Sequence, residues 1–507
     1  GERPAGDPPG TLRVLAGSEL KDVAPLAGRI RDATGVNLRF DYVGTLEGAE
    51  RIASPQGAGV DLAWFSSARY LTLLTADGGR GRPVASERIM LSPVVLGIRR
   101  SLATRFGWAG NPDVTWKDIA AKARSGALRY GMTNPAASNS GFSALVGVAA
   151  ALAGTGDALQ TRDIDERGLT DFFKGQTLTA GSSGWLADAF VNDQQRLDGI
   201  INYESVLLGL NASGKLREPL ELIYPKDGII TADYPLLLLN QAKRAEYDKL
   251  VTYLRSPEVQ RQLMTSTARR PVVPEVAPDQ RFPDRVLVEL PFPASLQVVN
   301  DLLFAYLNRI RRPAHTIYVL DVSGSMEGER IAALKQALVN LTGADTSISG
   351  RFASFRARER VTVITFAEDV IEERDFTVER GGADAAGLRQ IRAYVGGLKL
   401  YGGTAIFTAM QRAYQRAAAD AQRDRDAFTS IVLLTDGENN RGIAVDQFLG
   451  GLQGLPEQAR SVKTFAIQFG EADPAELQRI VQATKGARFD ANQTSLAAAF
   501  KEIRGYQ

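Results

Sequence analysis

Three oxygen-bearing side chains follow an apolar run in the C-terminal half of the chain. Asp321, Ser323 and Ser325 occupy alternate positions directly after the residues Ile317 to Leu320. The apolar run predicts a buried strand, and open α/β sheets place their ligand sites at the carboxyl ends of such strands. Oxygen side chains in this arrangement indicate half of a site for a hard divalent cation.

The other half of this site must come from loops further along the chain, because an octahedral cation needs about six oxygen ligands. Thr404 lies in a turn made flexible by Gly402 and Gly403, and Asp436 comes directly after the apolar residues 430–434. The carboxyl ends of parallel strands meet at one edge of a sheet. The sequence therefore predicts a metal site formed by Asp321, Ser323, Ser325, Thr404 and Asp436.

The elements around these residues alternate between strand and helix patterns, which predicts a doubly wound α/β domain. Strands are expected at 315–320, 360–366, 370–378, 430–434, 462–469 and 487–489, with 370–378 as an antiparallel edge strand. Helices are expected at 329–341, 384–398, 405–421, 445–452, 474–484 and 496–503. Asp473 and Pro474 fit the cap and first position of one of these helices.

The D-x-S-x-S, Thr and T-D-G elements together resemble the metal ion-dependent adhesion site (MIDAS) of the von Willebrand factor A domain, which has a Rossmann-like fold. The resemblance implies that Ser323, Ser325 and Thr404 are hydroxyl ligands and that Asp321 and Asp436 are carboxylates that often act through water. It also implies a protein partner that presents an acidic residue to the ion. Hard oxygen ligands favour magnesium, Mg²⁺, with Mn²⁺ and Ca²⁺ as alternatives, over zinc and copper.

Composition excludes several classes of function. The chain has 507 residues, no cysteine, one histidine and a net charge of +2. The absence of cysteine excludes thiolate chemistry and disulfides, and a single histidine argues against a Ser-His-Asp triad. The small net charge gives no indication of nucleic-acid binding, and no apolar run is long enough to span a membrane. His315 reads as an ordinary strand residue, and the pairs 99–100, 269–270 and 311–312, all arginines, read as solvated residues. With hydroxyls and two carboxylates but no evident general base, the chain is expected not to be an enzyme.

The first three hundred residues predict a separate α/β region, because the chain is too long for one core. Strands are expected at 11–16, 36–43, 60–65 and 127–132, with a helix capped by Ser18 through Arg31 and an apolar helix that begins near Ser140. The free N–H groups at the start of that second helix favour an anion.

This region resembles the two-lobed solute-binding proteins of bacterial ABC importers, a type II periplasmic-binding-protein-like fold. The matching features are Gly-Ser at 17–18, Ser-Ser at 66–67, the segment Asn134 to Gly141, and Asn-Tyr-Glu at 202–204. The resemblance implies that the cleft between the lobes is lined by Ser18, Ser67, Ser140 and Tyr203. Glu204 would repel an anion, which leaves a cationic or zwitterionic solute, or an empty cleft, as alternatives.

We expect a flexible lead-in at 1–10, a solute-binding-protein-like domain at 11–285, a linker and packing helix at 286–312 and a von Willebrand factor A domain at 313–507. This organisation predicts a non-enzymatic, extracytoplasmic bacterial binding protein, with metal-dependent protein-protein interaction and a small solute as a second ligand. The chain is expected to be membrane-anchored or secreted through a segment outside it. The alternative is an adaptor subunit that docks on an ATPase or chelatase-type partner.

Overall fold

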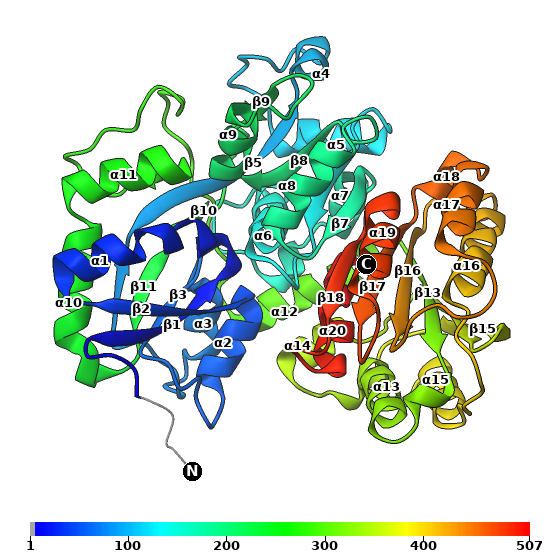
Figure 1. Cartoon of the computed structure of the whole chain (residues 1–507). Coiled ribbons are helices and arrows are strands. Elements are labelled where there is room, and N and C mark those ends of the chain that lie inside the picture. The colour runs from blue at the N-terminus through cyan, green and yellow to red at the C-terminus, as the bar shows by residue number, and fades with distance from the viewer. Residues whose placement is uncertain (1–5) are drawn as a thin grey trace. The chain divides into compact units, whose positions relative to one another are not determined.

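The computed structural model describes residues 6–507 and divides the chain into two units between Leu303 and Phe304. The first unit has two lobes, each built on its own sheet, and the second has a single sheet (Figure 1). The first five residues of the predicted lead-in lie outside the described residues. Within the rest of that lead-in, Asp7 accepts hydrogen bonds from Arg13 and Arg39, so it is attached to the first strands.

The first lobe is a five-stranded sheet in the order β2-β1-β3-β11-β4. Its first three strands are parallel, and β11 runs antiparallel to both of its neighbours. The strands are β1 (Thr11–Gly17), β2 (Asn37–Val43), β3 (Leu62–Trp64), β4 (Ala85–Arg88) and β11 (Pro235–Leu238). The helices are α1 (Ala27–Thr34), α2 (Thr45–Ala53), α3 (Arg69–Leu74), α10 (Arg244–Leu254) and α11 (Pro257–Thr267).

The second lobe is a seven-stranded sheet centred on the long strand β5 (Met90–Arg99). Its other strands are β6 (Tyr130–Thr133), β7 (Gln176–Ala180), β8 (Gly199–Tyr203), β9 (Leu220–Ile223), β10 (Thr231–Ala232) and β12 (Arg270–Pro271). The helices are α4 (Arg100–Arg105), α5 (Trp116–Arg124), α6 (Asn139–Ala153), α7 (Glu166–Phe173), α8 (Ser183–Asn192) and α9 (Glu204–Ala212). The core includes α6, whose residues 139–150 are all buried.

The chain crosses between the lobes three times. It leaves the first sheet after β4, comes back between β10 and β11, and then pairs β12 with the start of β5. Tyr234, at the second passage, has φ of 44°, a left-handed conformation that costs a side-chain-bearing residue some strain. These passages give the two-lobed type II arrangement that the sequence predicted.

The predicted helix from Ser18 to Arg31 is wrong in its first half. The segment forms short 3-10 turns at Ser18–Asp22 and Ala24–Leu26, and α1 begins only at Ala27. Pro25 explains the break, because it has no N–H to donate within a continuous helix. The side chain of Ser18 makes no capping hydrogen bond.

The second unit is a doubly wound six-stranded sheet in the order β15-β14-β13-β16-β17-β18, in which only β15 is antiparallel. The strands are β13 (Ala314–Asp321), β14 (Glu359–Phe366), β15 (Val370–Val378), β16 (Phe428–Thr435), β17 (Lys463–Gln468) and β18 (Ala487–Asp490). Central strands β13 and β16 consist almost wholly of buried residues, as expected for a parallel sheet covered on both faces. This confirms the predicted fold class.

The helices of this unit are α13 (Glu329–Val339), α14 (Ile348–Ala353), α15 (Ala386–Gly396), α16 (Ile406–Ala421), α17 (Val445–Gln453), α18 (Glu457–Arg460), α19 (Pro474–Thr484) and α20 (Leu496–Ile503). The predicted helix cap holds, because the side chain of Asp473 accepts a hydrogen bond from the N–H of Ala475. The helix expected at the linker is α12 (Leu296–Ala305), which spans the division between the units. No helix within residues 6–507 is long and apolar enough to cross a membrane.

The prediction that the arginine pairs are solvated is wrong for Arg269 and Arg311, which are 3% and 4% exposed. Arg269 pairs with Asp22 at 2.9 Å, and Arg311 with Glu359 at 3.1 Å. A buried guanidinium requires such partners, and both carboxylates lie far along the chain from the arginine that they pair with.

Candidate functional site

Most of the predicted metal ligands lie at the edge of the second unit's sheet where its parallel strands end. Asp321 is the last residue of β13 and is fully buried. Its Oδ1 accepts a hydrogen bond from the N–H of Ser323, and its Oδ2 accepts one from Thr435 Oγ1, both at 2.8 Å. Burial raises the pKa of this carboxyl group. Asp321 therefore ties the loop after β13 to the end of the neighbouring strand β16.

Three further oxygens form a continuous chain beside Asp321. Ser323 Oγ and Ser325 Oγ are 2.9 Å apart, and Ser325 Oγ donates to Asp436 Oδ1 at 2.8 Å. The serines follow β13 and Asp436 follows β16, which are parallel neighbours. The register of two adjacent strands thus brings together side chains that are more than a hundred residues apart in sequence.

The loop that carries Thr404 lies against both of these strand ends. Tyr401 donates its N–H to the carbonyl of Val322 at 2.9 Å and forms a parallel bridge with Ser323. The N–H of Thr404 is held by Asn440 Oδ1 at 2.8 Å, and the Thr404 side chain is buried. Gly403 has φ of 78°, and a Cβ at this position would lie 2.7 Å from the Cβ of Glu368, so the turn requires glycine.

Two loop residues have a different role from the one that their position suggests. From the sequence, we expect the loop residues around the ion to supply selectivity for a partner, among them Met326, Glu327, Tyr401, Glu438 and Asn439. Met326 is wholly buried, and Asn439 accepts from the N–H of Ile406 and donates to the carbonyl of Ile443. Glu327, Tyr401 and Glu438 are exposed and remain as rim residues.

Arg330 contacts this site and was not singled out by the sequence. Its Nη1 donates to Asp436 Oδ2 at 2.8 Å, and its Nη2 donates to Glu471 Oε1 at 2.8 Å. No local motif marks it, because its partners are 106 and 141 residues away.

The donor set fits a hard cation such as Mg²⁺. Hydroxyl and carboxylate oxygens converge there, and hard cations prefer such ligands over the nitrogen and sulfur ligands that suit zinc and copper. Within residues 6–507, no group of three or more histidine, aspartate or glutamate side chains gathers that could by itself hold a metal ion. Asp321 and Asp436 carry two negative charges, one of which is shared with the Arg330 guanidinium. Ser323, Ser325 and Thr404 could hold such an ion, with the two carboxylates beside them.

In the first unit, Tyr203 lies where the two lobes meet. It is the last residue of β8 and is 1% exposed. Its hydroxyl accepts a hydrogen bond from Asn139 Nδ2 at 3.0 Å and donates to Glu19 Oε1 at 3.1 Å. Burial and the nearby Glu19 raise the pKa of Tyr203 well above its usual range. Because Glu19 belongs to the first lobe, this contact joins the two lobes.

The other residues predicted for the cleft do not gather around Tyr203 through hydrogen bonds. Ser140 lies within a buried group of the second lobe, at 2.9 Å from Thr133 Oγ1 and 2.7 Å from Ser183 Oγ. Ser67 accepts from the N–H of Arg69 at the start of α3. The neighbouring Ser66, which was not predicted as a site residue, is buried close to Tyr203. Within residues 6–507, its hydroxyl and that of Thr45 have no hydrogen bond of normal geometry.

Glu204 is paired inside the protein, a partnership that the sequence did not suggest. It is fully buried, and Arg270 donates to both of its oxygens at 2.8 and 2.7 Å, while Tyr224 donates a third hydrogen bond. Burial and the adjacent Glu204 raise the pKa of Tyr224. The charge of this carboxylate is therefore balanced by Arg270 inside the protein.

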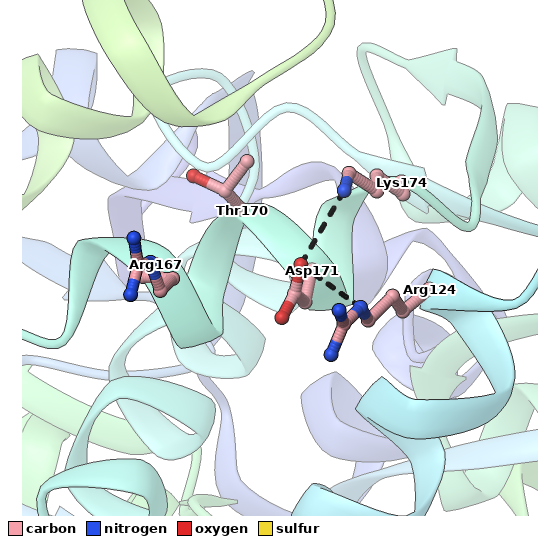
Figure 2. Close-up of a pocket in the computed structure, with 5 residues that line it drawn as sticks. All are labelled: Arg124, Arg167, Thr170, Asp171 and Lys174. Atoms are coloured by element: carbon pink, nitrogen blue, oxygen red, sulfur yellow. Dashed lines mark hydrogen bonds and ion pairs between the residues drawn. The ribbon is translucent and has the colours of Figure 1, made fainter.

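A cavity of about 600 Å³ lies elsewhere on the second lobe, on helices α5 and α7 (Figure 2). Arg124, Arg167, Thr170, Asp171 and Lys174 line it, and Asp171 pairs with Lys174 at 3.4 Å and with Arg124 at 4.0 Å. None of the predicted site residues contributes to this cavity. We assign it no role.

Comparison with known proteins matches two families in sequence. Residues 12–265, half of the chain, match the bacterial extracellular solute-binding protein family, and residues 317–504 match the von Willebrand factor type A domain. The family description indicates an extracytoplasmic location. Both regions are modules of binding and interaction, and both were predicted.

Individual relatives match only parts of the chain. Human inter-alpha-trypsin inhibitor heavy chain H4 is 27% identical over 154 residues, which are 29% of this chain and 15% of that protein. An uncharacterized Synechocystis protein, sll0103, is 33% identical over 135 residues, 26% of this chain and 27% of that protein. The chain thus spans less than a third of the length of these curated relatives.

Several solved structures resemble parts of the chain. A ferric binding protein from Campylobacter jejuni has a TM-score of 0.45 and 14% identity, covering 58% of this chain and 96% of that one. A von Willebrand factor type A structure from Catenulispora acidiphila has a TM-score of 0.30 and 20% identity, covering 38% of this chain and 42% of that one. By the family match over residues 12–265, the chain belongs to the bacterial extracellular solute-binding protein family, and it continues into a von Willebrand factor type A domain.

Proposed function

We propose that this protein is a non-enzymatic extracytoplasmic binding protein that recognises a protein partner through a divalent ion on its second unit. The observation that carries the proposal is the connected oxygen set Ser323, Ser325 and Asp436 at the ends of two adjacent parallel strands. The pairing of Tyr401 with Ser323, in the loop that carries Thr404, supports including Thr404 in the site. Mg²⁺ is the proposed ion, with Mn²⁺ and Ca²⁺ as alternatives.

The residues around this set would determine what can bind there. A bound divalent ion would supply an electrophilic position for one carboxylate oxygen of a partner. Ser323, Ser325 and Thr404 contribute neutral oxygens, so they orient the ion without cancelling its charge. Tyr401, which is 44% exposed, offers an aromatic contact at the rim, and Glu327 and Glu438 disfavour further acidic groups. The proposed partner therefore presents one acidic residue within a neutral or basic surface.

Calorimetric titration with Mg²⁺ tests the metal site directly. The wild-type chain is expected to bind, and the double variant Asp321→Ala plus Asp436→Ala is expected to lose that binding. A second double variant, Asp384→Ala plus Asp446→Ala, removes two exposed carboxylates of the same unit and serves as the matched control. Unchanged affinity in the Asp321/Asp436 variant would contradict the assignment.

We propose that the first unit binds a small solute where its lobes meet. Three hydroxyls support this proposal: that of Tyr203, and the buried hydroxyls of Thr45 and Ser66, for which the described part of the chain offers no hydrogen bond of normal geometry. A solute that binds there must replace the contact between Tyr203 and Glu19. Thermal unfolding in the presence of oxyanions, sugars, amino acids and metal ions tests it, because a ligand that binds only the folded state raises the melting temperature. If none does so, the unit is a scaffold.

A further inference from the structure

The position of Arg330 beside the proposed metal site points to a role in selecting the ion. Arg330 is the second residue of α13 and follows the D-x-S-x-S segment closely in sequence. Its Nη1 lies 2.8 Å from Asp436 Oδ2 and 2.6 Å from Glu471 Oε2, and its Nη2 donates to Glu471 Oε1. Asp436 is fully buried, while the Arg330 side chain is 29% exposed.

The guanidinium group is held in this position by the backbone beneath it. Gly470 has φ of 55°, and a Cβ at that residue would lie 2.8 Å from the Arg330 Cζ. The next residue, Glu471, donates its N–H to the carbonyl of Asp436 at 2.9 Å. The Arg330 guanidinium therefore packs on the main chain at Gly470, which has no side chain there. It lies between the carboxylates of Asp436 and Glu471, which the backbone hydrogen bond keeps close together. Such a support fixes the orientation of the planar guanidinium fork.

The contacts divide the two oxygens of Asp436 between different partners. Oδ1 accepts from Ser325, on the side of the proposed ion, and Oδ2 accepts from Arg330. A guanidinium hydrogen bond to Oδ2 disfavours the approach of a cation to both oxygens of the carboxylate at once.

We propose that Arg330 is a positioning residue that restricts Asp436 to one oxygen and so biases the site toward a small octahedral ion and against Ca²⁺. This inference rests on the proposed metal site. Ca²⁺ takes six to eight oxygens, about 2.3 to 2.6 Å away, and often binds a carboxylate through both oxygens, whereas Mg²⁺ needs near-octahedral geometry and keeps several waters. The positive charge of Arg330 also leaves the bound ion less neutralised, which strengthens its attraction for a partner's carboxylate.

Titration of the full chain with Mg²⁺ and, separately, with Ca²⁺ tests this inference. In Arg330→Met, Asp436 can turn both oxygens to the ion, so Ca²⁺ affinity is expected to rise roughly tenfold relative to Mg²⁺ affinity. Arg330→Lys retains the charge without the fork and is expected to lie between the wild type and Arg330→Met. Arg412→Met removes an arginine paired with Glu373 on the edge strand β15 and is expected to leave both affinities unchanged.

Glu471→Gln is expected to lower the affinity of the site for both Mg²⁺ and Ca²⁺. Without the Glu471 charge, Arg330 is less neutralised and competes more strongly for Asp436, so both ions are expected to bind more weakly. Thermal unfolding without metal verifies that each variant is folded. An unchanged ratio of Ca²⁺ to Mg²⁺ affinity in folded Arg330→Met would overturn the inference, even if both affinities changed together. Absence of binding by the wild type would instead contradict the metal site, and the inference with it.

Discussion

Arg270 donates two hydrogen bonds to the carboxylate of Glu204, at 2.8 and 2.7 Å, where the second lobe receives its last strand. The preceding residue, Arg269, donates to Asp22 and to the carbonyl of Glu19 in the first lobe. Two consecutive arginines thus fasten one strand to both lobes. The Glu204 carboxylate, which we expected at the solute site, pairs with Arg270 in this internal connection.

Removal of the Glu204 carboxylate should therefore destabilise the first unit. Glu204→Ala leaves the Arg270 guanidinium in a largely buried position without its counter-charge, a change that typically costs about 3 to 5 kcal/mol. Denaturant unfolding monitored on the transition of the first unit measures it. Glu47→Ala, which breaks the exposed pair with Arg51, is the control and should change stability by at most about 1 kcal/mol. Equal effects of the two substitutions would show that the buried pair is not a major support.

The Tyr203 hydroxyl should control how firmly the lobes are held together. Tyr203→Phe keeps the ring packed in the core and removes the hydrogen bonds to Asn139 and Glu19. Without added solute, the radius of gyration from small-angle scattering is expected to increase while the melting temperature falls only modestly. Tyr42→Phe, which removes a hydroxyl from a strand of the first lobe, should leave the scattering curve unchanged. An unchanged radius of gyration in Tyr203→Phe would assign the lobe contact to other residues.

Four residues of the proposed metal site, Asp321, Ser323, Ser325 and Asp436, could be singled out from sequence because each lies within a few residues of a strand end that an apolar pattern reveals. Thr404 lies instead in a glycine-containing turn before α16. The register of the adjacent strands β13 and β16 then brings the residues after one strand close to those after the other. The arginines were not predictable in this way. Arg269 pairs with Asp22, which is 247 residues away in sequence, and Arg311 pairs with Glu359, which is 48 residues away. Nothing near either arginine in sequence therefore distinguishes it from a solvated arginine. The role of Arg330 was hidden for the same reason.

His315 should make the second unit less stable in mild acid. It is 1% exposed in β13, bonds Thr362 Oγ1 at 2.8 Å, and has its pKa lowered to about 4 by burial and by the nearby Arg360. The folded state keeps this imidazole neutral, whereas the unfolded chain takes up a proton below its ordinary pKa of 6.5. Stability is therefore lost as the pH falls from about 6.5 to about 4, by up to about 3 kcal/mol.

Unfolding of the second unit at pH 7 and pH 4.5, in the wild type and in His315→Gln, isolates this contribution. Asp375, Asp420, Arg360 and Arg416 surround the imidazole in both proteins, so the difference between the two proteins is the informative quantity. The glutamine variant should lose less stability on acidification than the wild type. An equal loss in both would show that His315 does not contribute.

Glu359 should be among the most costly residues of the second unit to neutralise. It is 2% exposed, and it accepts hydrogen bonds from Arg504 at 2.8 Å to each oxygen, from Arg311 at 3.1 Å and from the N–H of Arg356. Burial alone would raise its pKa, but Arg504 and Arg311 outweigh this effect and hold the pKa of Glu359 below its ordinary value. The residue joins the start of β14 to the segment before β13 and to the C-terminal turn.

Glu359→Gln keeps the shape of the side chain and removes the charge that balances two buried guanidinium groups. The expected loss in stability of the second unit is about 3 kcal/mol or more, since each arginine remains buried without a counter-ion. Arg504→Met should cost less, because Glu359 keeps Arg311 as a partner. Asp384→Asn breaks an exposed pair with Arg380 and should stay within about 0.5 kcal/mol of the wild type. Denaturant titration of the three variants ranks their losses in the free energy of unfolding of the second unit. A loss for Glu359→Gln no larger than that for Asp384→Asn would mean that the two arginines form other ion pairs.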